Sequence, residues 1–202
     1  MKRESIAFLT LSLALVCIGI FMVYSASAVE SQPTGRLLKQ LVDVSIGLTA
    51  MFIGIQLDYH KLKEPWVWRA LFAFVAVLLV LVLVPGIGVV RGGARRWIEV
   101  FGFSFQPSEF GKFAVILMMA VKLSMNQERI VEFWRGIVPP LFLTCIIAAL
   151  IVAEKDLGTP LVICTTAFLM LVAAGARWRH LLPTLLPGFA LVAVLVVTSP
   201  HR

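Results

Sequence analysis

Residues 91–112 read Arg-Gly-Gly-Ala-Arg-Arg-Trp-Ile-Glu-Val-Phe-Gly-Phe-Ser-Phe-Gln-Pro-Ser-Glu-Phe-Gly-Lys and form the longest polar interruption in a mostly apolar chain. The chain has 202 residues, of which 60% are hydrophobic. Soluble domains have roughly 45–50% apolar residues, and a soluble fold of this size could not cover so much apolar surface. The composition therefore predicts an integral membrane protein, with this charged stretch as a loop between spans.

Apolar runs on both sides of this stretch predict an all-α, polytopic fold of about seven membrane-spanning helices, in a single domain over residues 1–202. The expected spans cover residues 6–23, 41–57, 66–84, 110–123, 137–152, 161–175 and 181–197. The first run resembles a signal peptide, but its apolar core is longer than usual and further spans follow. The fourth span is the weakest, because Lys112 and Lys122 lie near its ends.

The net charge of +7 has a membrane explanation. Lys and Arg flank membrane spans and contact lipid phosphates, so the charge does not indicate nucleic acid. A cytoplasmic N-terminus would put residues 29–40, 91–109 and 154–159 outside, and the inner loops would then carry more Lys and Arg. The outer side nevertheless carries more positive charge than this rule leads us to expect, mostly because of the arginines of residues 91–96. The three cysteines lie within apolar runs and have no metal-ligand spacing.

Gln106, Pro107, Ser108 and Glu109 precede the fourth expected span, and Lys112 follows them. Proline and an acidic residue are both favoured in a first helical turn, so Glu109 could simply belong to a helix start. The spacing also puts Glu109 and Lys112 on one helix face. Because an ionisable pair inside a bilayer is costly unless it faces a polar cavity, we favour a functional pair that lines one.

Arg95 and Arg96, beside Trp97, have two interpretations. They could only contact phospholipid headgroups, which charge and spacing alone favour, or they could bind phosphate oxygens in a bidentate manner. Asp156 has three: it could cap the helix that follows it, bind a cation or fix an arginine. The residues alone leave these alternatives open.

Four motifs stand at span boundaries. They are Val23-Tyr24-Ser25-Ala26-Ser27, Gly93-Ala94-Arg95-Arg96-Trp97-Ile98, Phe105-Gln106-Pro107-Ser108-Glu109 with Lys112, and Asp156-Leu157-Gly158-Thr159. Together and in this order they resemble the SEDS family (FtsW, RodA and SpoVE) over the whole chain. The Gly-Ala-Arg-Arg-Trp form is most similar to the division branch, FtsW.

The resemblance implies a multi-pass protein of the bacterial inner membrane, with about ten spans and a cytoplasmic N-terminus. Such a protein polymerises lipid II, the undecaprenyl-pyrophosphate-linked disaccharide precursor, into glycan strands for septal or elongation cell-wall synthesis. The implied partners are a class B penicillin-binding protein and other division proteins, with a divalent cation (Mg or Mn) and no nucleic acid. The implied substrate-binding residues are Arg95, Arg96, Trp97, Gln106, Ser108, Glu109, Lys112, Asp156 and Thr159.

The chain departs from the family pattern in two places. It has Glu154-Lys155 where the family usually has Gln-Pro. The family's catalytic aspartate would lie beyond residue 202, so we expect this chain to be the N-terminal part of a family member and inactive alone. On this hypothesis the aspartate deprotonates the acceptor hydroxyl, while Arg95, Arg96 and Lys112 with the cation offset charge on the pyrophosphate leaving group. Glu109 would hold Lys112.

Two other functions remain possible interpretations of the same charges. One is a lipid-linked oligosaccharide transporter (flippase), in which polar groups would be distributed through the bilayer. The other is a non-catalytic division scaffold that recruits partners through its helices.

Overall fold

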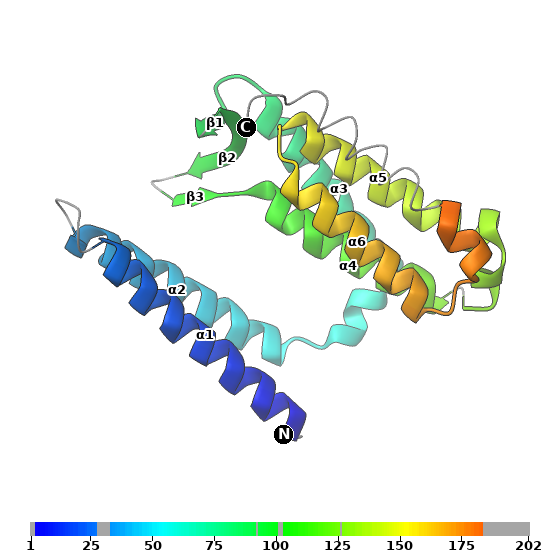
Figure 1. Ribbon diagram of the computed structural model, residues 1–202, viewed down its shortest axis with the longest axis horizontal. Coiled ribbons are helices and arrows are strands. Elements are labelled where there is room, and N and C mark those ends of the chain that lie inside the picture. The colour runs from blue at the N-terminus through cyan, green and yellow to red at the C-terminus, as the bar shows by residue number, and fades with distance from the viewer. Residues whose placement is uncertain (1–2, 28–32, 92, 101–102, 126, 184–202) are drawn as a thin grey trace. The chain divides into compact units, whose positions relative to one another are not determined.

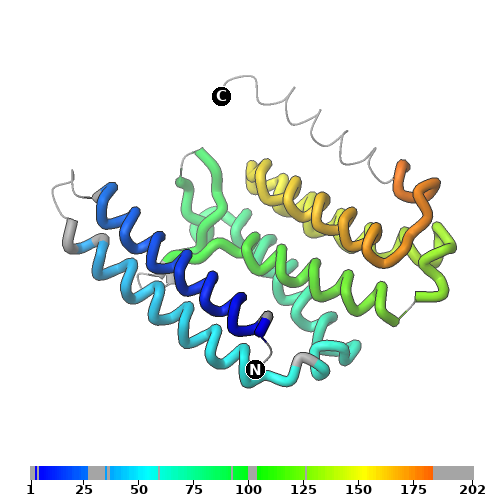
Figure 2. Tube along the Cα trace, turned by 60° about the horizontal axis from the view of Figure 1, so that its bottom comes forward, coloured from blue at the N-terminus to red at the C-terminus, as the bar shows by residue number. Residues whose placement is uncertain are grey.

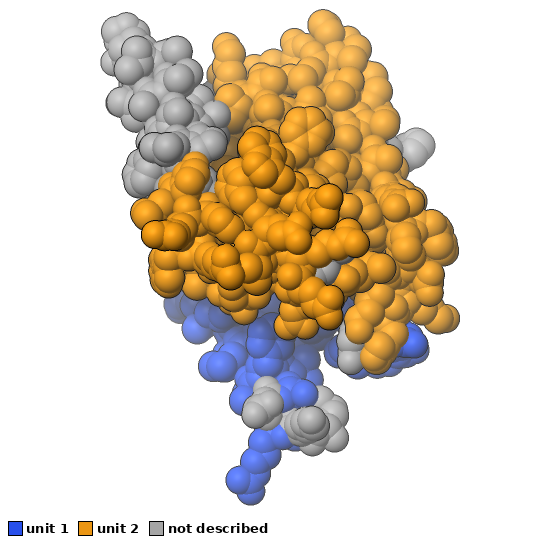
Figure 3. Space-filling view, turned by 90° about the vertical axis from the view of Figure 1, so that its right-hand side faces the viewer, with its two compact units in different colours: residues 1–58 blue, residues 59–202 orange. Residues whose placement is uncertain are grey.

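The computed structural model describes residues 3–27, 33–91, 93–100, 103–125 and 127–183. The chain divides into two compact units, residues 1–58 and residues 59–202, which Figure 3 colours separately. Each unit is described by itself. The expectation of a single domain over residues 1–202 stays a prediction.

The first unit is a pair of long helices, α1 (Arg3–Ser27) and α2 (Pro33–Gln56), which run side by side in Figures 1 and 2. Their apolar side chains are largely exposed, as in helices that face lipid. Hydroxyl groups within them are satisfied locally: Thr10 donates to the Ile6 carbonyl at 2.9 Å, and Ser45 donates to the Leu41 carbonyl at 2.8 Å. Such internal bonds let polar residues lie within an apolar helix.

The second unit is built on four helices: α3 (Pro65–Leu83), α4 (Pro107–Met125), α5 (Val138–Ala153) and α6 (Gly158–Ala173). They pack together in Figure 1, and their apolar faces meet in a core that includes the fully buried Val75, Met118, Ile147 and Leu171. Three short helical segments accompany them: η1 (Tyr59–Lys63) precedes α3, and η2 (Gln127–Val131) and the π-helix η3 (Phe133–Ile137) lie between α4 and α5.

Four helices of the described chain are long and apolar enough to cross a membrane: Ser5–Ala26, Leu37–Gln56, Pro65–Leu83 and Phe133–Ala153. They correspond to the first, second, third and fifth expected spans and confirm a polytopic membrane fold. α4 and α6 occupy the fourth and sixth positions, where α4 carries Glu109, Lys112 and Lys122, and α6 has only 16 residues. The seventh expected span, residues 181–197, lies mostly outside the described residues.

The described residues between 88 and 105 form a small antiparallel sheet, where the sequence predicted only a loop. Its strands are β1 (Gly88–Arg91), β2 (Ala94–Val100) and β3 (Phe103–Phe105), in that order. Arg91 pairs with Ala94 across the first turn, and Gly93 between them has a φ of +79°, a conformation that glycine adopts without steric cost. The sheet therefore fixes residues 94–100 in one orientation, which a loop would not do.

Candidate functional site

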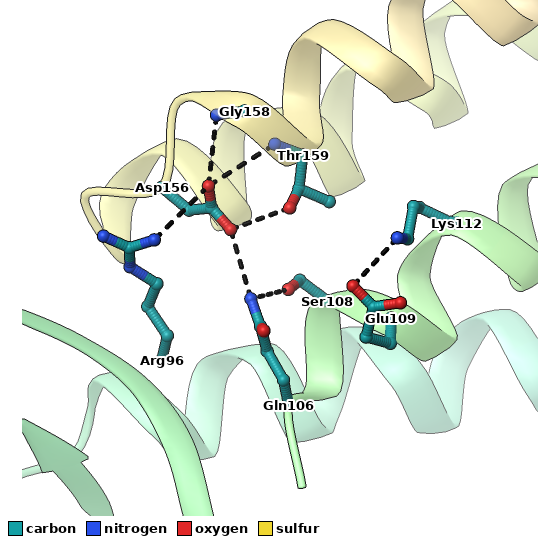
Figure 4. Close-up of polar contacts among 8 residues, drawn as sticks. All are labelled: Arg96, Gln106, Ser108, Glu109, Lys112, Asp156, Gly158 and Thr159. Atoms are coloured by element: carbon teal, nitrogen blue, oxygen red, sulfur yellow. Dashed lines mark hydrogen bonds and ion pairs between the residues drawn. The ribbon is translucent and has the colours of Figure 1, made fainter. Parts of the chain in front are cut away.

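Three segments of the second unit bring polar side chains together at one end of the helices (Figure 4). β2 supplies Arg96, the residues around the start of α4 supply Gln106 and Ser108, and the turn from α5 into α6 supplies Asp156, with Thr159 following in α6. These five belong to the nine residues that the sequence analysis singled out. We call them the Asp156 cluster.

Asp156 is at the centre of the cluster and is only 5% exposed. Its Oδ1 atom accepts hydrogen bonds from the backbone N–H groups of Gly158 at 3.1 Å and Thr159 at 3.4 Å. Its Oδ2 atom accepts one from the Thr159 hydroxyl at 2.7 Å and one from Nε2 of Gln106 at 3.2 Å. Asp156 therefore satisfies N–H groups at the start of α6, as the capping interpretation predicted, and it also holds the residue that precedes α4.

Arg96 is the cationic partner of this carboxylate. Its Nη1 atom lies 3.7 Å from Oδ1 of Asp156, and its side chain is 24% exposed. Asp156 thus fixes an arginine, one of the three roles that the sequence left open. The Nε atom of Arg96 is buried and has no hydrogen-bond partner among the described residues, so the guanidinium keeps an unused donor.

Gln106 connects the carboxylate to α4. Its Nε2 atom donates to the Ser108 hydroxyl at 2.8 Å as well as to Asp156. Ser108 is completely buried, and this bond gives its hydroxyl a partner. The amide therefore joins α4 to the turn before α6 through two short polar contacts.

Glu109 and Lys112 form a separate ion pair on the first turns of α4. Nζ of Lys112 lies 2.8 Å from Oε1 of Glu109, as the i,i+3 spacing predicted. The Glu109 side chain is 58% exposed and that of Lys112 is 32% exposed. In Figure 4 the pair lies apart from the Asp156 cluster, and no drawn contact joins the two.

Arg95 has different surroundings from Arg96, because the pairing of β2 with β1 is irregular here: Val90 pairs with Arg95 and Val89 with Trp97, which leaves Arg96 as the extra residue of a bulge. Its Nη1 atom donates to the carbonyl oxygen of Leu83, at the end of α3, at 3.2 Å. The aliphatic part of Arg95 lies against Gly88: a Cβ atom there would be 2.7 Å from Cγ of Arg95 and 2.0 Å from the Val82 carbonyl oxygen. The absence of a side chain at Gly88 thus makes room for Arg95.

Trp97 also lies outside the Asp156 cluster. The guanidinium carbon of Arg91 lies 5.3 Å from the centre of its ring, a cation–π distance. Arg91 forms an ion pair with Glu99, and the side chains of both are about half exposed. Trp97 therefore belongs to a contact within the sheet, between β1 and β2.

Glu154 is a buried acid that the sequence analysis did not count as a site residue. It directly follows α5 as its C-cap residue and is 1% exposed, and neither carboxyl oxygen has a hydrogen-bond partner in the described part of the chain. Burial raises its pKa to about 8, with a further contribution from Asp156 that Arg96 partly opposes. The one signal in the sequence was that Glu154 stands where the resemblance expects Gln.

Lys155 stands next to Glu154, where the resemblance expects proline, and its backbone conformation depends on this residue not being proline. Its φ of +60° is uncommon for a residue other than glycine, and its backbone N–H donates to the Val152 carbonyl at 2.9 Å. A proline could neither adopt this φ nor donate this bond. The turn that carries Glu154 and Asp156 is therefore closed in a way that proline at position 155 would not allow.

The expected divalent cation finds no ready-made ligand set here. Within the described ranges no group of three or more His, Cys, Asp or Glu side chains is placed to hold a metal ion. The oxygens of Asp156 are already engaged by Arg96, Gln106 and the start of α6. The residues at this site therefore do not fit a metal centre of their own.

Fold and site together define a polytopic membrane protein with a buried, ion-paired polar cluster at one end of its helices. Residues 5–202 match the FtsW/RodA/SpoVE family, described as "Cell cycle protein". The chain belongs to this family, which confirms the predicted SEDS membership.

Two relatives illustrate the similarity. The chain is 40% identical over 201 residues to stage V sporulation protein E of Bacillus subtilis, covering 95% of this chain and 53% of the relative. It is 35% identical over 206 residues to the probable peptidoglycan glycosyltransferase FtsW of Geobacter metallireducens, covering 100% of this chain and 54% of the relative. The chain thus spans about half the length of the curated relatives it matches.

Solved structures share the fold. The crystal structure of the rod shape determining protein RodA of Thermus thermophilus matches with a TM-score of 0.75 and 28% identity, over 93% of this chain and 58% of that one. A chain from a peptidoglycan synthase complex, in a study of how polymerization and crosslinking are coordinated, matches with a TM-score of 0.72 and 26% identity. That match covers 94% of this chain and 59% of the other.

Proposed function

We propose that the protein to which this chain belongs is a peptidoglycan glycosyltransferase, which polymerises lipid II into glycan strands for cell division or cell shape. The name of the Geobacter relative supports this activity, and the match to RodA supports a fold shared with that protein. The similarity to FtsW and to stage V sporulation protein E favours the division side of the family.

The observation that carries the proposal is Arg96 held by Asp156 at 3.7 Å, with a buried Nε atom that has no partner among the described residues. In the reaction, an acceptor sugar hydroxyl attacks the anomeric carbon of the donor, and the lipid pyrophosphate leaves with the electron pair of the broken bond. A guanidinium fixed in place before the reaction can stabilise that charge with little reorganisation, and its effect is larger in a water-poor site.

The remaining residues have distinct proposed roles. Lys112 provides a second cation for the pyrophosphate, and Glu109 positions it through their 2.8 Å contact. Arg95 remains a proposed substrate contact, although its own partners differ from those of Arg96. Acceptor deprotonation is assigned to the aspartate that the resemblance places beyond residue 202.

The surroundings of the reaction are also part of the proposal. We place the protein in the bacterial inner membrane with a cytoplasmic N-terminus and the Asp156 cluster at the outer face. A class B penicillin-binding protein is the proposed partner, supported by the match to a chain of a peptidoglycan synthase complex. The whole protein is also proposed to require a divalent cation, which has no proposed role in the Asp156 cluster.

Polymerisation of lipid II by the full-length protein with its partner tests the activity. We expect glycan strands from the unmodified protein, and a loss of at least about tenfold in rate for Arg96→Ala. Arg135→Ala is the matched control, since its side chain is 76% exposed and lies outside the cluster. Full activity of both Arg96→Ala and Lys112→Ala would refute these roles. If the unmodified protein makes no polymer, an assay of lipid II movement across vesicles distinguishes a transporter from a scaffold.

A further inference from the structure

A cavity beside the turn between α5 and α6 is lined by polar side chains other than those of the Asp156 cluster. Its volume is about 280 Å³, and Arg95, Glu154 and Lys155 line it together with Gly93 and apolar residues. Glu154 is the unusual member, because it is 1% exposed and both of its oxygens lack partners in the described structure. A buried carboxyl group without hydrogen bonds is costly, so it needs a functional explanation.

Backbone contacts hold two of the charged residues that line the cavity. Lys155 is held at a φ of +60° by the bond from its N–H to Val152, immediately after Glu154. Arg95, which also lines the cavity, is anchored to the Leu83 carbonyl through Nη1, while its buried Nε atom has no partner among the described residues. Nothing lies within 4 Å of the position that a Cβ atom of Gly93 would occupy.

The chemistry of the lining defines the kind of ligand. Arg95 and Lys155 are cations, and the raised pKa of Glu154, caused mainly by burial, keeps its carboxyl group largely neutral at pH 7. A neutral carboxyl group donates a hydrogen bond, whereas an ionised one only accepts. The wall therefore combines two positive charges with donors, and it suits an anion rich in acceptor oxygens. The volume is enough for a tetrahedral oxyanion with bound water, at about 30 Å³ per water molecule.

We propose that this cavity binds a phosphate-class oxyanion between Arg95 and Lys155, with the Glu154 carboxyl group as a hydrogen-bonding partner. The site does not depend on the proposed polymerase activity, because it would bind the same ion in a transporter or a scaffold. The oxyanion could come from an anionic lipid headgroup or from free phosphate. Both sources present the same oxygens to the site.

Inorganic sulfate is the first probe, since its charge is constant over the relevant pH range. The full-length protein, in a detergent without phosphate, is titrated with sodium sulfate and with sodium chloride at equal ionic strength, and thermal unfolding is recorded. We expect saturable stabilisation by sulfate alone, and an affinity at least about tenfold weaker in Lys155→Met. Lys61→Met is the control, because it removes the same charge from an exposed position in η1. Equal stabilisation of all three proteins, or no stabilisation by sulfate, would overturn the proposal.

Glu154→Gln provides an independent measurement if the lysine variant folds poorly. Glutamine keeps a donor and an acceptor at this position at every pH. Asp156 and Arg96 are the charged groups that act on Glu154, Arg95 and Lys155 line the same cavity, and burial raises the pKa of Glu154 to about 8. Sulfate affinity should fall by about tenfold per pH unit above pH 8 in the unmodified protein and stay constant in Glu154→Gln. The same pH dependence in both proteins would exclude Glu154 from the site.

Two further arms identify the source of the ion and separate this proposal from the proposed function. Sulfate affinity is measured in nanodiscs of phosphatidylglycerol and of phosphatidylcholine. If a lipid headgroup is the natural occupant, phosphatidylglycerol should compete with sulfate and lower this affinity. If sulfate affinity is equal in the two lipids, free phosphate is favoured. Polymerisation is measured on the same preparations: sulfate binding without polymer would overturn the polymerase proposal alone, and polymer without sulfate binding would overturn this one alone.

Discussion

Nη1 of Arg96 lies 3.7 Å from Oδ1 of Asp156, and this ion pair links strand β2 to the turn before α6. The same carboxylate accepts hydrogen bonds from the first residues of α6 and from Gln106, which precedes α4. One buried acid thus connects the turn before α6 to two segments that lie at least 50 residues earlier in the chain. Its charge should matter for both stability and activity.

Asp156→Asn tests this connection. The variant keeps the size of the side chain and one carbonyl oxygen, but it removes the counter-charge of Arg96. It also puts an NH₂ group or a single oxygen where Oδ2 now accepts from both Gln106 and Thr159. We expect a loss of stability of about 2–4 kcal/mol, together with strongly reduced polymerisation, measured by unfolding and by glycan synthesis in the full-length protein.

A double-mutant cycle isolates the ion pair from the hydrogen bonds. Arg96→Met is combined with Asp156→Asn, and the coupling energy is calculated from the four stabilities. If the two changes are additive, the 3.7 Å contact contributes nothing, and the effect of Asp156 comes from its hydrogen bonds alone.

Gln106 offers a test of charge at the same point. Gln106→Glu would place a second carboxylate near Oδ2 of Asp156, where Nε2 now lies at 3.2 Å, whereas Gln106→Met only removes the hydrogen bonds. Because like charges repel strongly in a partly buried site, Glu should destabilise more than Met, by about 1–2 kcal/mol at pH 8. Unfolding at lower pH should reduce this difference as the new acid becomes protonated. A variant series in which Met is the more harmful would show that hydrogen bonding outweighs charge here.

Lys112→Ala separates stability from function. The pair with Glu109 is substantially exposed, so its loss should change stability by less than about 1 kcal/mol. Polymerisation should nevertheless fall by at least about tenfold if Lys112 contacts the pyrophosphate. Arg135→Ala is a matched control, because Arg135 and Glu132 form another exposed i,i+3 pair, at 3.9 Å. Equal activity of the two variants would remove Lys112 from the proposed site.

The helical part of the fold was predictable from sequence because length and hydropathy determine which segments can cross a membrane. The pair of Glu109 and Lys112 followed from helical spacing alone. The contact of Arg96 with Asp156 was one of several open alternatives, since spacing along the chain does not give distances between a loop and a later turn. The packing of both β2 and α6 against α4 brings these residues together.

The small sheet and the Glu154 cavity were not predicted, for different reasons. The strands have only 4, 7 and 3 residues, and pairing between short strands leaves a weak pattern in a charged sequence. Glu154 looked like an ordinary turn residue in the sequence. Its burial depends on the conformation of the turn at Lys155, which the sequence does not reveal. Arg95 and Arg96 looked equivalent in the sequence, but Arg95 pairs with Val90 while Arg96 is the extra residue of a bulge in β2, and their side chains have separate partners.

Glu154 predicts a specific pH dependence of stability. Its pKa rises from an ordinary value of 4.5 to about 8 in the folded protein, so the folded state binds this proton more tightly. The contribution to stability is therefore complete below pH 4.5 and is lost as the pH rises towards 8. Glu154→Gln should remove this dependence and stabilise the protein by about 1–3 kcal/mol at pH 8, relative to the unmodified protein. Unfolding curves of both proteins from acid to alkaline pH check it, and parallel curves would contradict the burial of a neutral acid.

Gly88→Ala should displace Arg95 from its position against β1. A Cβ atom at this position would lie 2.0 Å from the Val82 carbonyl oxygen and 2.7 Å from Cγ of Arg95, so the backbone must shift. We expect destabilisation by about 1–3 kcal/mol and weaker binding of sulfate to the cavity that Arg95 lines. Gly54→Ala in α2 is the control: nothing lies within 4 Å of its Cβ position, and alanine is the better helix former. If Gly88→Ala leaves both stability and sulfate affinity unchanged, the close approach of Arg95 to this glycine does not hold the cavity in shape.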